Sequence, residues 1–68
     1  MNIIVNGKKE EFESLQKLDD LLRHLKICEE EKGFAVAINE TVIFKSVWQN
    51  TILSEGDRVE IIRATQGG

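Results

Sequence analysis

One stretch of this 68-residue chain carries the spacing of an amphipathic helix. Leu15, Leu18, Leu22 and Leu25 recur at intervals of three and four residues, and Leu21 lies beside them. This spacing places the leucine side chains on one face of a helix of about ten residues. A single helix with one apolar face needs a second apolar surface to cover, so the rest of the chain must supply that surface.

The charged residues of the same stretch fit a helix that runs in this direction. Asp19 and Asp20 would lie in its first turn, where negative charge is favourable to the helix dipole. Arg23, His24 and Lys26 would lie in its last turns, where positive charge is favourable. The run Glu29-Glu30-Glu31-Lys32-Gly33 is then expected to end the helical pattern in a solvated loop.

The remaining segments read as short strands separated by turns. Asn6-Gly7 is the strongest turn signal, because both residues tolerate the positive φ of a type I′ hairpin turn. Asn39-Glu40 predicts a second turn, and residues 54–57 predict a third. The predicted strands are residues 3–5, 8–12, 34–38, 41–44 and 58–63.

The predicted order is therefore strand, strand, helix, strand, strand, strand. One helix packed across one face of a mixed sheet of about five strands is an α+β arrangement. Residues 45–50, which include Trp48, are expected to form a short connection that covers the rim of the sheet. We expect one domain, residues 1–64, followed by a flexible tail, residues 65–68. The strand residues expected to form the core with the helix are Ile3, Val5, Val36, Ile38, Val59 and Ile61.

The alternation of strand side chains also predicts an apolar outer face. If the core residues of the first and last strands point inward, Ile4 and Ile62 point outward. Ala35 and Ala37 would place small side chains near them. Apolar side chains that cluster on a surface mark interaction sites, so we expect these four residues to form a docking patch for a partner protein.

The composition disfavours several kinds of site. One cysteine excludes an internal disulfide, and one cysteine with one histidine cannot complete a tetrahedral metal site, so we expect no metal. The net charge of −3 disfavours nucleic acid. We see no membrane-spanning run and expect a cytoplasmic protein. His24 is expected to be a solvated surface residue and Cys28 a small packing residue.

The last two residues are Gly67 and Gly68. Glycine brings no side chain to bury, but a tail without β-carbons can enter a narrow active-site channel of another protein. A terminal carboxyl group has a reference pKa of about 3.3–3.7, so at neutral pH it is ionised. A carboxylate does not react with nucleophiles until it is activated, for instance by adenylation.

Several short motifs, spread over nearly the whole chain, match the sequence pattern of a known protein family. They are Asn6-Gly7, Leu21-Leu22, Leu25, Ala35-Val36-Ala37-Ile38-Asn39, Ser46, Trp48, Gly56-Asp57-Arg58-Val59-Glu60-Ile61 and Gly67-Gly68. With these motifs the chain resembles the ubiquitin-like β-grasp family and, more narrowly, the ThiS family of sulfur carriers in thiamine thiazole biosynthesis. It departs from the family pattern where Lys17 replaces a threonine, Phe44 a proline and Gln66 a small residue.

The resemblance implies a carrier with no catalytic residue of its own. An E1-like adenylyltransferase of the ThiF type would use ATP to adenylate Gly68, with Gln66, Gly67 and Gly68 entering the partner's site. A persulfide donor, normally a cysteine desulfurase, would then leave a thiocarboxylate on Gly68. A ThiG-type thiazole synthase would take that sulfur. No cofactor bound to the chain itself is implied.

Two other functions stay open at the level of sequence. The small subunit of molybdopterin synthase shares the fold and the Gly-Gly tail, although it usually runs about a dozen residues longer. A β-grasp protein-binding module could use only the outer sheet face, with an incidental Gly-Gly. An enzyme is hard to support, because no nucleophile and base, and no pair of acids, are arranged together.

Overall fold

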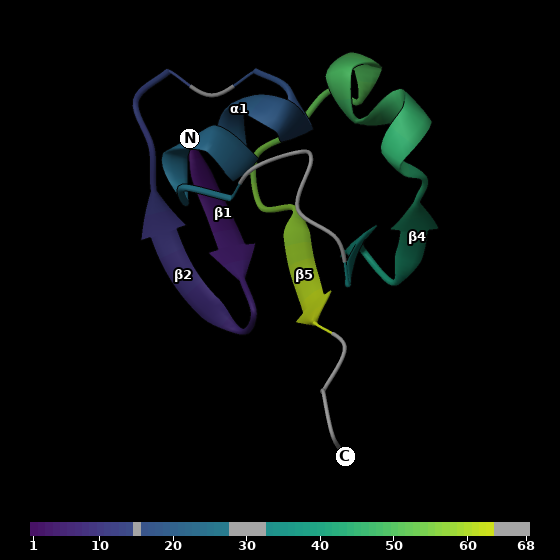
Figure 1. The fold of residues 1–68 in the computed structure, drawn as a ribbon. Coiled ribbons are helices and arrows are strands. Elements are labelled where there is room, and N and C mark those ends of the chain that lie inside the picture. The colour runs from purple at the N-terminus through teal and green to yellow at the C-terminus, as the bar shows by residue number, and fades with distance from the viewer. Residues whose placement is uncertain (15, 28–32, 64–68) are drawn as a thin grey trace.

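The computed structural model describes residues 1–14, 16–27 and 33–63, and these residues form an α+β fold (Figure 1). The expected order of elements is confirmed. The second and fourth strands each end one residue earlier than the sequence predicts. The elements are β1 (Asn2–Val5), β2 (Lys8–Glu11), α1 (Leu18–His24), β3 (Phe34–Ile38), β4 (Thr41–Ile43), the 3₁₀ helix η1 (Lys45–Asn50) and β5 (Arg58–Arg63).

The strands form one mixed sheet in the order β2-β1-β5-β3-β4. β1 and β5 are parallel, and Figure 1 shows their arrows pointing the same way, whereas the other neighbouring pairs are antiparallel. β5 is therefore the central strand, and it joins the β1–β2 hairpin to the β3–β4 hairpin. The two edges of the sheet are β2 and β4.

Both hairpins close through two residues with left-handed backbone conformations. Asn6 and Gly7 have φ values of 50° and 82°, and Asn39 and Glu40 have φ values of 50° and 73°. Positive φ at both central residues defines the type I′ turn, which matches the twist of the strands that it joins. The two predicted hairpin turns are therefore confirmed.

The helix α1 is shorter than the expected ten residues, because it spans seven. The Asp20 carboxylate accepts hydrogen bonds from the backbone amides of Gln16 and Lys17 at 3.3 and 3.1 Å, which satisfies the amide of the N-cap residue Lys17 and that of the residue before it. Lys26 has a φ of 62° and lies beyond the helix, not in its last turn. This reversal brings Ile27 back into the core, where its amide donates to the Leu22 carbonyl at 2.8 Å.

The core lies between α1 and the inner face of the sheet. Ile38 and Ile61 are only half-buried at its margin, whereas the other four strand residues that were expected in the core are buried. Leu25, at the end of the leucine face, is also half-buried. The buried apolar residues of this cluster are Ile3, Val5, Phe12, Leu18, Leu21, Leu22, Ile27, Val36, Trp48, Leu53 and Val59.

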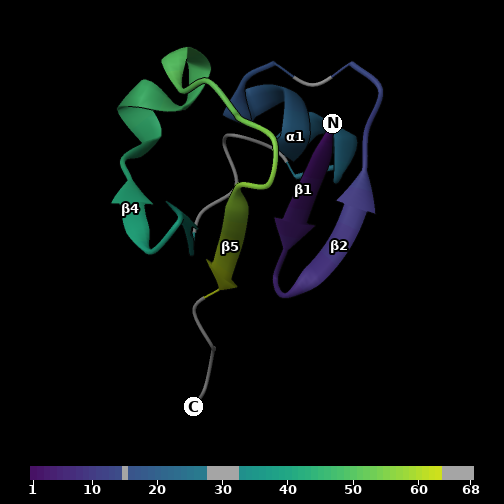
Figure 2. The same ribbon diagram turned by 180° about the vertical axis from the view of Figure 1, so that it is seen from behind.

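Trp48 belongs to the core and is not an exposed binding platform. Its side chain is only 3% exposed, and its indole Nε1 donates a hydrogen bond to the Ile43 carbonyl at 2.9 Å. The helix η1 that carries Trp48 lies beside α1, as both views show (Figure 1 and Figure 2). The predicted connection over the rim of the sheet is thus a 3₁₀ helix that closes one end of the core.

Candidate functional site

The candidate site begins where β5 ends, at Arg63. Residues 64–68 follow, and the predictions for Gln66, Gly67 and Gly68 lie outside the residues that the structure describes. Five residues of extended chain can reach at most about 17 Å. The position of the end of β5 therefore limits which surface of this protein a partner can touch while it holds the tail.

β5 is held in the sheet by the side chains of the two hairpin turns. The Asn6 Oδ1 atom accepts a hydrogen bond from the Ile61 amide at 2.8 Å. The Asn39 Oδ1 atom accepts one from the Arg58 amide at 2.9 Å, and its Nδ2 donates to Asp57 Oδ1 at 3.0 Å. These bonds add to the backbone pairing on both sides of β5, so the central strand is a well-supported base for the tail.

The last residue of β5 is also anchored through its side chain. The Arg63 guanidinium lies over the ring of Phe34, 5.7 Å from its centroid. That ring in turn packs against the buried Trp48 ring, with 5.4 Å between centroids. A cation over an aromatic face is attracted by the ring quadrupole. The starting point of the tail is thereby fixed to the core.

Two of the predicted docking residues are neighbours on the outer face beside this end of β5. Ile62 and Ala35 lie opposite each other in the register of β5 and β3. Both are exposed, and the Ile62 side chain retains 54% of its accessible surface. The outward orientation of Ile62 follows from the buried Val59 and the alternation of the strand.

Two further apolar residues, Val42 and Phe44, extend this surface, and neither was included in the prediction. Val42 lies opposite Ala37 in the β3–β4 register and is 57% exposed. Phe44 follows β4 in an extended conformation (φ −67°, ψ 143°), is 75% exposed, and lies on the Val42 side of the strand. The signal was available, since the predicted strand 41–44 alternates, but its faces were not assigned. We define the apolar patch as Ala35, Val42, Phe44 and Ile62.

The other two predicted docking residues, Ile4 and Ala37, are less exposed than Ile62 and Ala35. Ala37 does face outward, but it is only 5% exposed, because its methyl group lies between Val42 and Glu60 on the neighbouring strands. Ile4 is half-buried and lies level with Arg58. Arg58 and Ile62 are four residues apart, or about 13 Å along a strand. Ile4 and Ile62 are therefore not adjacent.

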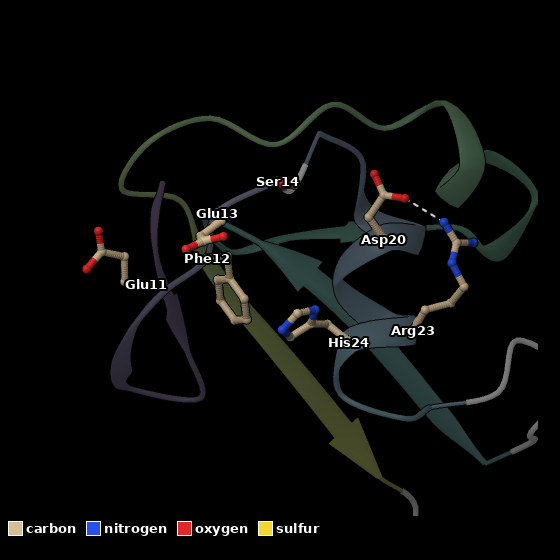
Figure 3. Close-up of a pocket in the computed structure, with 7 residues that line it drawn as sticks. All are labelled: Glu11, Phe12, Glu13, Ser14, Asp20, Arg23 and His24. Carbon is tan, nitrogen blue, oxygen red and sulfur yellow. Dashed lines mark hydrogen bonds and ion pairs between the residues drawn. The ribbon is translucent and has the colours of Figure 1, made fainter.

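A cavity of about 580 Å³ lies elsewhere, between the end of β2 and α1 (Figure 3). The His24 ring meets the Phe12 ring edge to face at 5.1 Å, and His24 is exposed as expected. Arg23 pairs with Asp19 and Asp20. Among the hydrogen bonds of the described residues, none joins Ser14 to His24. The lining residues of the cavity are Glu11, Phe12, Glu13, Ser14, Asp20, Arg23 and His24.

Other kinds of site are not found in the described part of the chain. Within residues 1–14, 16–27 and 33–63, no three His, Cys, Asp or Glu residues come together in a way that could hold a metal ion. No helix in these ranges is long and apolar enough to cross a membrane. Cys28 lies outside the described residues.

The comparison with protein families decides between the β-grasp families. The model of the ThiS family matches residues 3–68, nearly the full length of the chain and including the Gly-Gly. The chain belongs to the ThiS family. The predicted resemblance is thus confirmed, and membership places the chain among the sulfur carriers of thiamine biosynthesis.

Solved structures of ThiS agree with this assignment. The crystal structure of the thiamine biosynthesis protein ThiS from Geobacter metallireducens is similar to this chain, with a TM-score of 0.82 and 28% sequence identity over 100% of both chains. The solution structure of a thiamine biosynthesis protein from the same organism gives a TM-score of 0.77 and 30% identity over 100% of this chain and 88% of the other. No curated protein matches the chain significantly.

Two departures of this ThiS-family chain from the family pattern now have a structural description. At the N-cap, Lys17 makes no side-chain cap hydrogen bond, and the Asp20 carboxylate accepts from the amides of Gln16 and Lys17. At Phe44 the chain places an exposed aromatic ring in the apolar patch. The third departure, Gln66, lies in the tail, outside the described residues.

Proposed function

We propose that this ThiS-family chain carries sulfur as a thiocarboxylate on Gly68 and delivers it to a ThiG-type thiazole synthase. The observation that carries the proposal is the family match, which runs to residue 68 and so includes Gly67-Gly68 after the central strand. The anchored end of β5 supports it, because a rigid domain with a slender tail suits chemistry performed inside another protein's active site.

The proposed loading reaction begins with activation. A ThiF-type adenylyltransferase binds ATP, and a Gly68 carboxylate oxygen attacks the α-phosphorus and releases pyrophosphate. The acyl-adenylate that results carries AMP as a good leaving group. The carboxylate itself lacks one, and this difference explains why the carrier requires an ATP-using partner.

Sulfur transfer follows activation. A persulfide on a cysteine desulfurase or a related donor attacks the acyl carbon of Gly68 and displaces AMP. A thiol then cleaves the sulfur–sulfur bond, which leaves the thiocarboxylate on the carrier and a disulfide on the donor. The thiocarboxylate sulfur is nucleophilic and is attached to a specific protein, so it reaches the synthase without release of free sulfide.

We propose that the apolar patch contacts the activating partner while the tail occupies its active site. The patch lies on the outer face beside the end of β5, and five residues of tail reach at most about 17 Å beyond Arg63. A partner that holds Gly68 is therefore within reach of the patch. Exposed apolar side chains next to one another are the usual mark of such a docking surface.

The decisive experiment measures the intact mass of the protein after incubation with ATP, a ThiF-type adenylyltransferase, and a cysteine desulfurase with cysteine. The expected result is a mass gain equal to one oxygen replaced by one sulfur, localised to Gly68 by fragmentation. A matched variant that lacks Gly68 should keep the folded circular dichroism spectrum and gain no mass.

The outcome that contradicts the proposal is an unchanged mass when the same partners load a known carrier. Loading by a ThiF-type but not by a molybdopterin-pathway adenylyltransferase favours thiazole synthesis, and the reverse favours the molybdopterin alternative. If neither loads the chain but a partner still binds the folded domain, the protein is a binding module.

A further inference from the structure

The two edge strands of the sheet, β2 and β4, differ in how strongly their side chains discourage pairing with a further strand (Figure 1). The β2 edge consists of Lys8, Lys9, Glu10 and Glu11, and charged side chains on an edge discourage the addition of another strand. The β4 edge, Thr41–Ile43, carries no charge, and its exposed neighbour Phe44 is aromatic. An edge strand such as β4, which has no charged side chain, can pair with a further strand.

The backbone of β4 is oriented for such pairing. In a two-residue hairpin the residues that flank the turn form a hydrogen-bonded pair, and hydrogen-bonded pairs alternate with non-hydrogen-bonded ones. Ile38 pairs with Thr41, so the Val42 N–H and C=O point away from β3, toward the free edge. Phe44 continues the extended backbone and repeats this orientation two residues later.

We propose that the β4 edge pairs with the β4 edge of a second copy of this chain across a two-fold axis at Ile43. In this antiparallel register Val42 of one copy lies opposite Phe44 of the other, and the two residues exchange N–H···O=C bonds. Symmetry repeats the pair on the other side of Ile43. The sheets of the two copies then form one continuous sheet.

A second copy of the chain is the partner that suits this edge, because two antiparallel copies place complementary side chains opposite each other. Each exposed Val42 is covered by the exposed Phe44 of the other copy, and an aromatic ring opposite a β-branched side chain is a favourable cross-strand pair. The Phe44 carbonyl already accepts from Val47 at 3.0 Å but keeps a second lone pair.

A short edge predicts a weak dimer. The pairing uses only residues 42–44 of each copy, and small interfaces give low affinity. Val42 and Phe44 belong to the apolar patch, so a dimer would cover part of the patch and leave Ile62 and Ala35 accessible. This inference does not depend on sulfur transfer, and its test uses the protein without any partner.

Sedimentation equilibrium of the full chain tests the proposal. We expect the weight-average mass to rise from the monomer value of 7.7 kDa toward twice that value as the concentration increases from about 10 µM to about 1 mM. Over the same range, amide hydrogen exchange at Val42 and Phe44 should slow. A mass that stays at the monomer value, or exchange that slows elsewhere and not at these two amides, overturns the proposal.

Phe44→Pro is the sharpest variant, because it should leave the monomer intact. Its φ of −67° suits proline, and the Phe44 N–H points away from β3. The variant loses the ring and the edge donor, so dimerisation should weaken by about tenfold or more. Val42→Lys should have a similar effect, whereas Ile52→Lys, at a residue 72% exposed outside the edge, should not. Unchanged dimerisation in Phe44→Pro, or equal loss in Ile52→Lys, contradicts the assigned edge.

Discussion

A single carboxylate, that of Glu55, ties the beginning of the sheet to the turn before its last strand. The Asn2 amide donates to both Glu55 oxygens, at 3.0 and 3.1 Å, and the Gly56 amide donates to the Asn2 carbonyl at 2.7 Å. The bond from the Asn2 backbone is the main cause that lowers the pKa of Glu55. The Glu55 carboxylate thus helps to hold β1 in the sheet, as the side chains of Asn6 and Asn39 help to hold β5.

This arrangement predicts a stability that decreases in acid. A lowered pKa means that the folded state favours the ionised form, so the stabilisation is present above the ordinary pKa of 4.5 and is lost as the pH falls through the lower folded value. Glu55→Gln should therefore be less stable at pH 7 and less sensitive to pH below 4.5. Urea unfolding at a series of pH values measures both effects.

Glu60→Gln, at an exposed residue on the outer face of β5, is the matched control for Glu55→Gln. Asp20, whose pKa is lowered mainly by its hydrogen bond from the Lys17 backbone, retains part of the acid sensitivity in every variant. If Glu55→Gln and wild type lose the same amount of stability as the pH falls, the Asn2–Glu55 hydrogen bond does not cause the acid sensitivity.

At the scale of the elements, α1 contributes to stability chiefly through its buried leucines. Its length of seven residues is too short for an isolated helix in water, so it depends on packing against the sheet. Leu18, Leu21 and Leu22 have no exposed surface. The leucine spacing predicted the burial of these three residues correctly, whereas Leu25 is half-buried and Leu15 lies outside the described residues. The spacing did not reveal where the helix ends, because the left-handed turn at Lys26 has no glycine to mark it.

Leu22→Ala should reduce the free energy of unfolding by about 2–5 kcal/mol, since it removes a fully buried side chain and leaves a cavity. Such a loss is a large share of the stability of a domain of this size. The measurement is urea unfolding followed by circular dichroism.

Two control variants make the helix prediction specific. Leu22→Met keeps the side-chain volume and should cost less than about 1.5 kcal/mol. Leu25→Ala, at the half-buried end of the same face, should cost less than Leu22→Ala. If Leu25→Ala lost more free energy of unfolding than Leu22→Ala, the helix would face the sheet with a different side.

For the whole molecule, the sequence was sufficient for the order of elements and most of the core, because turns such as Asn6-Gly7 and the leucine spacing are local signals. It was insufficient for the docking surface. Which outward residues become neighbours depends on strand register, and the parallel register that sets Ile4 beside Arg58 has no signal in the sequence. Phe44 is a different case: the alternation of residues 41–44 signals that it shares a face with Val42, but its place beside Ala35 and Ile62 follows from the pairing of β4 with β3.

The proposed docking of the partner predicts that Ile62→Asp slows adenylation of Gly68 by about tenfold or more through a higher KM, since a central apolar contact is lost. Ile62 is 54% exposed, so the denaturant midpoint should stay close to that of wild type. ATP–pyrophosphate exchange measures the activation step.

Ile52→Asp is the control for that experiment, because Ile52 is 72% exposed but lies outside the patch. It should be activated like wild type. An equal defect in both variants would point to a general effect of added negative charge, and an unfolded Ile62→Asp variant would place Ile62 in the core.

The central position of β5 has a consequence for how the protein is made. β5 is the last of the strands to be synthesised, and it lies between two hairpins that do not pair with each other without it. The ribosome therefore produces two separate hairpins first, and the sheet closes only when residues 58–63 have emerged. We expect chains that end before residue 58 to leave the two hairpins unjoined, and an isolated two-stranded hairpin is only marginally stable, so such chains should be cleaved readily by proteases.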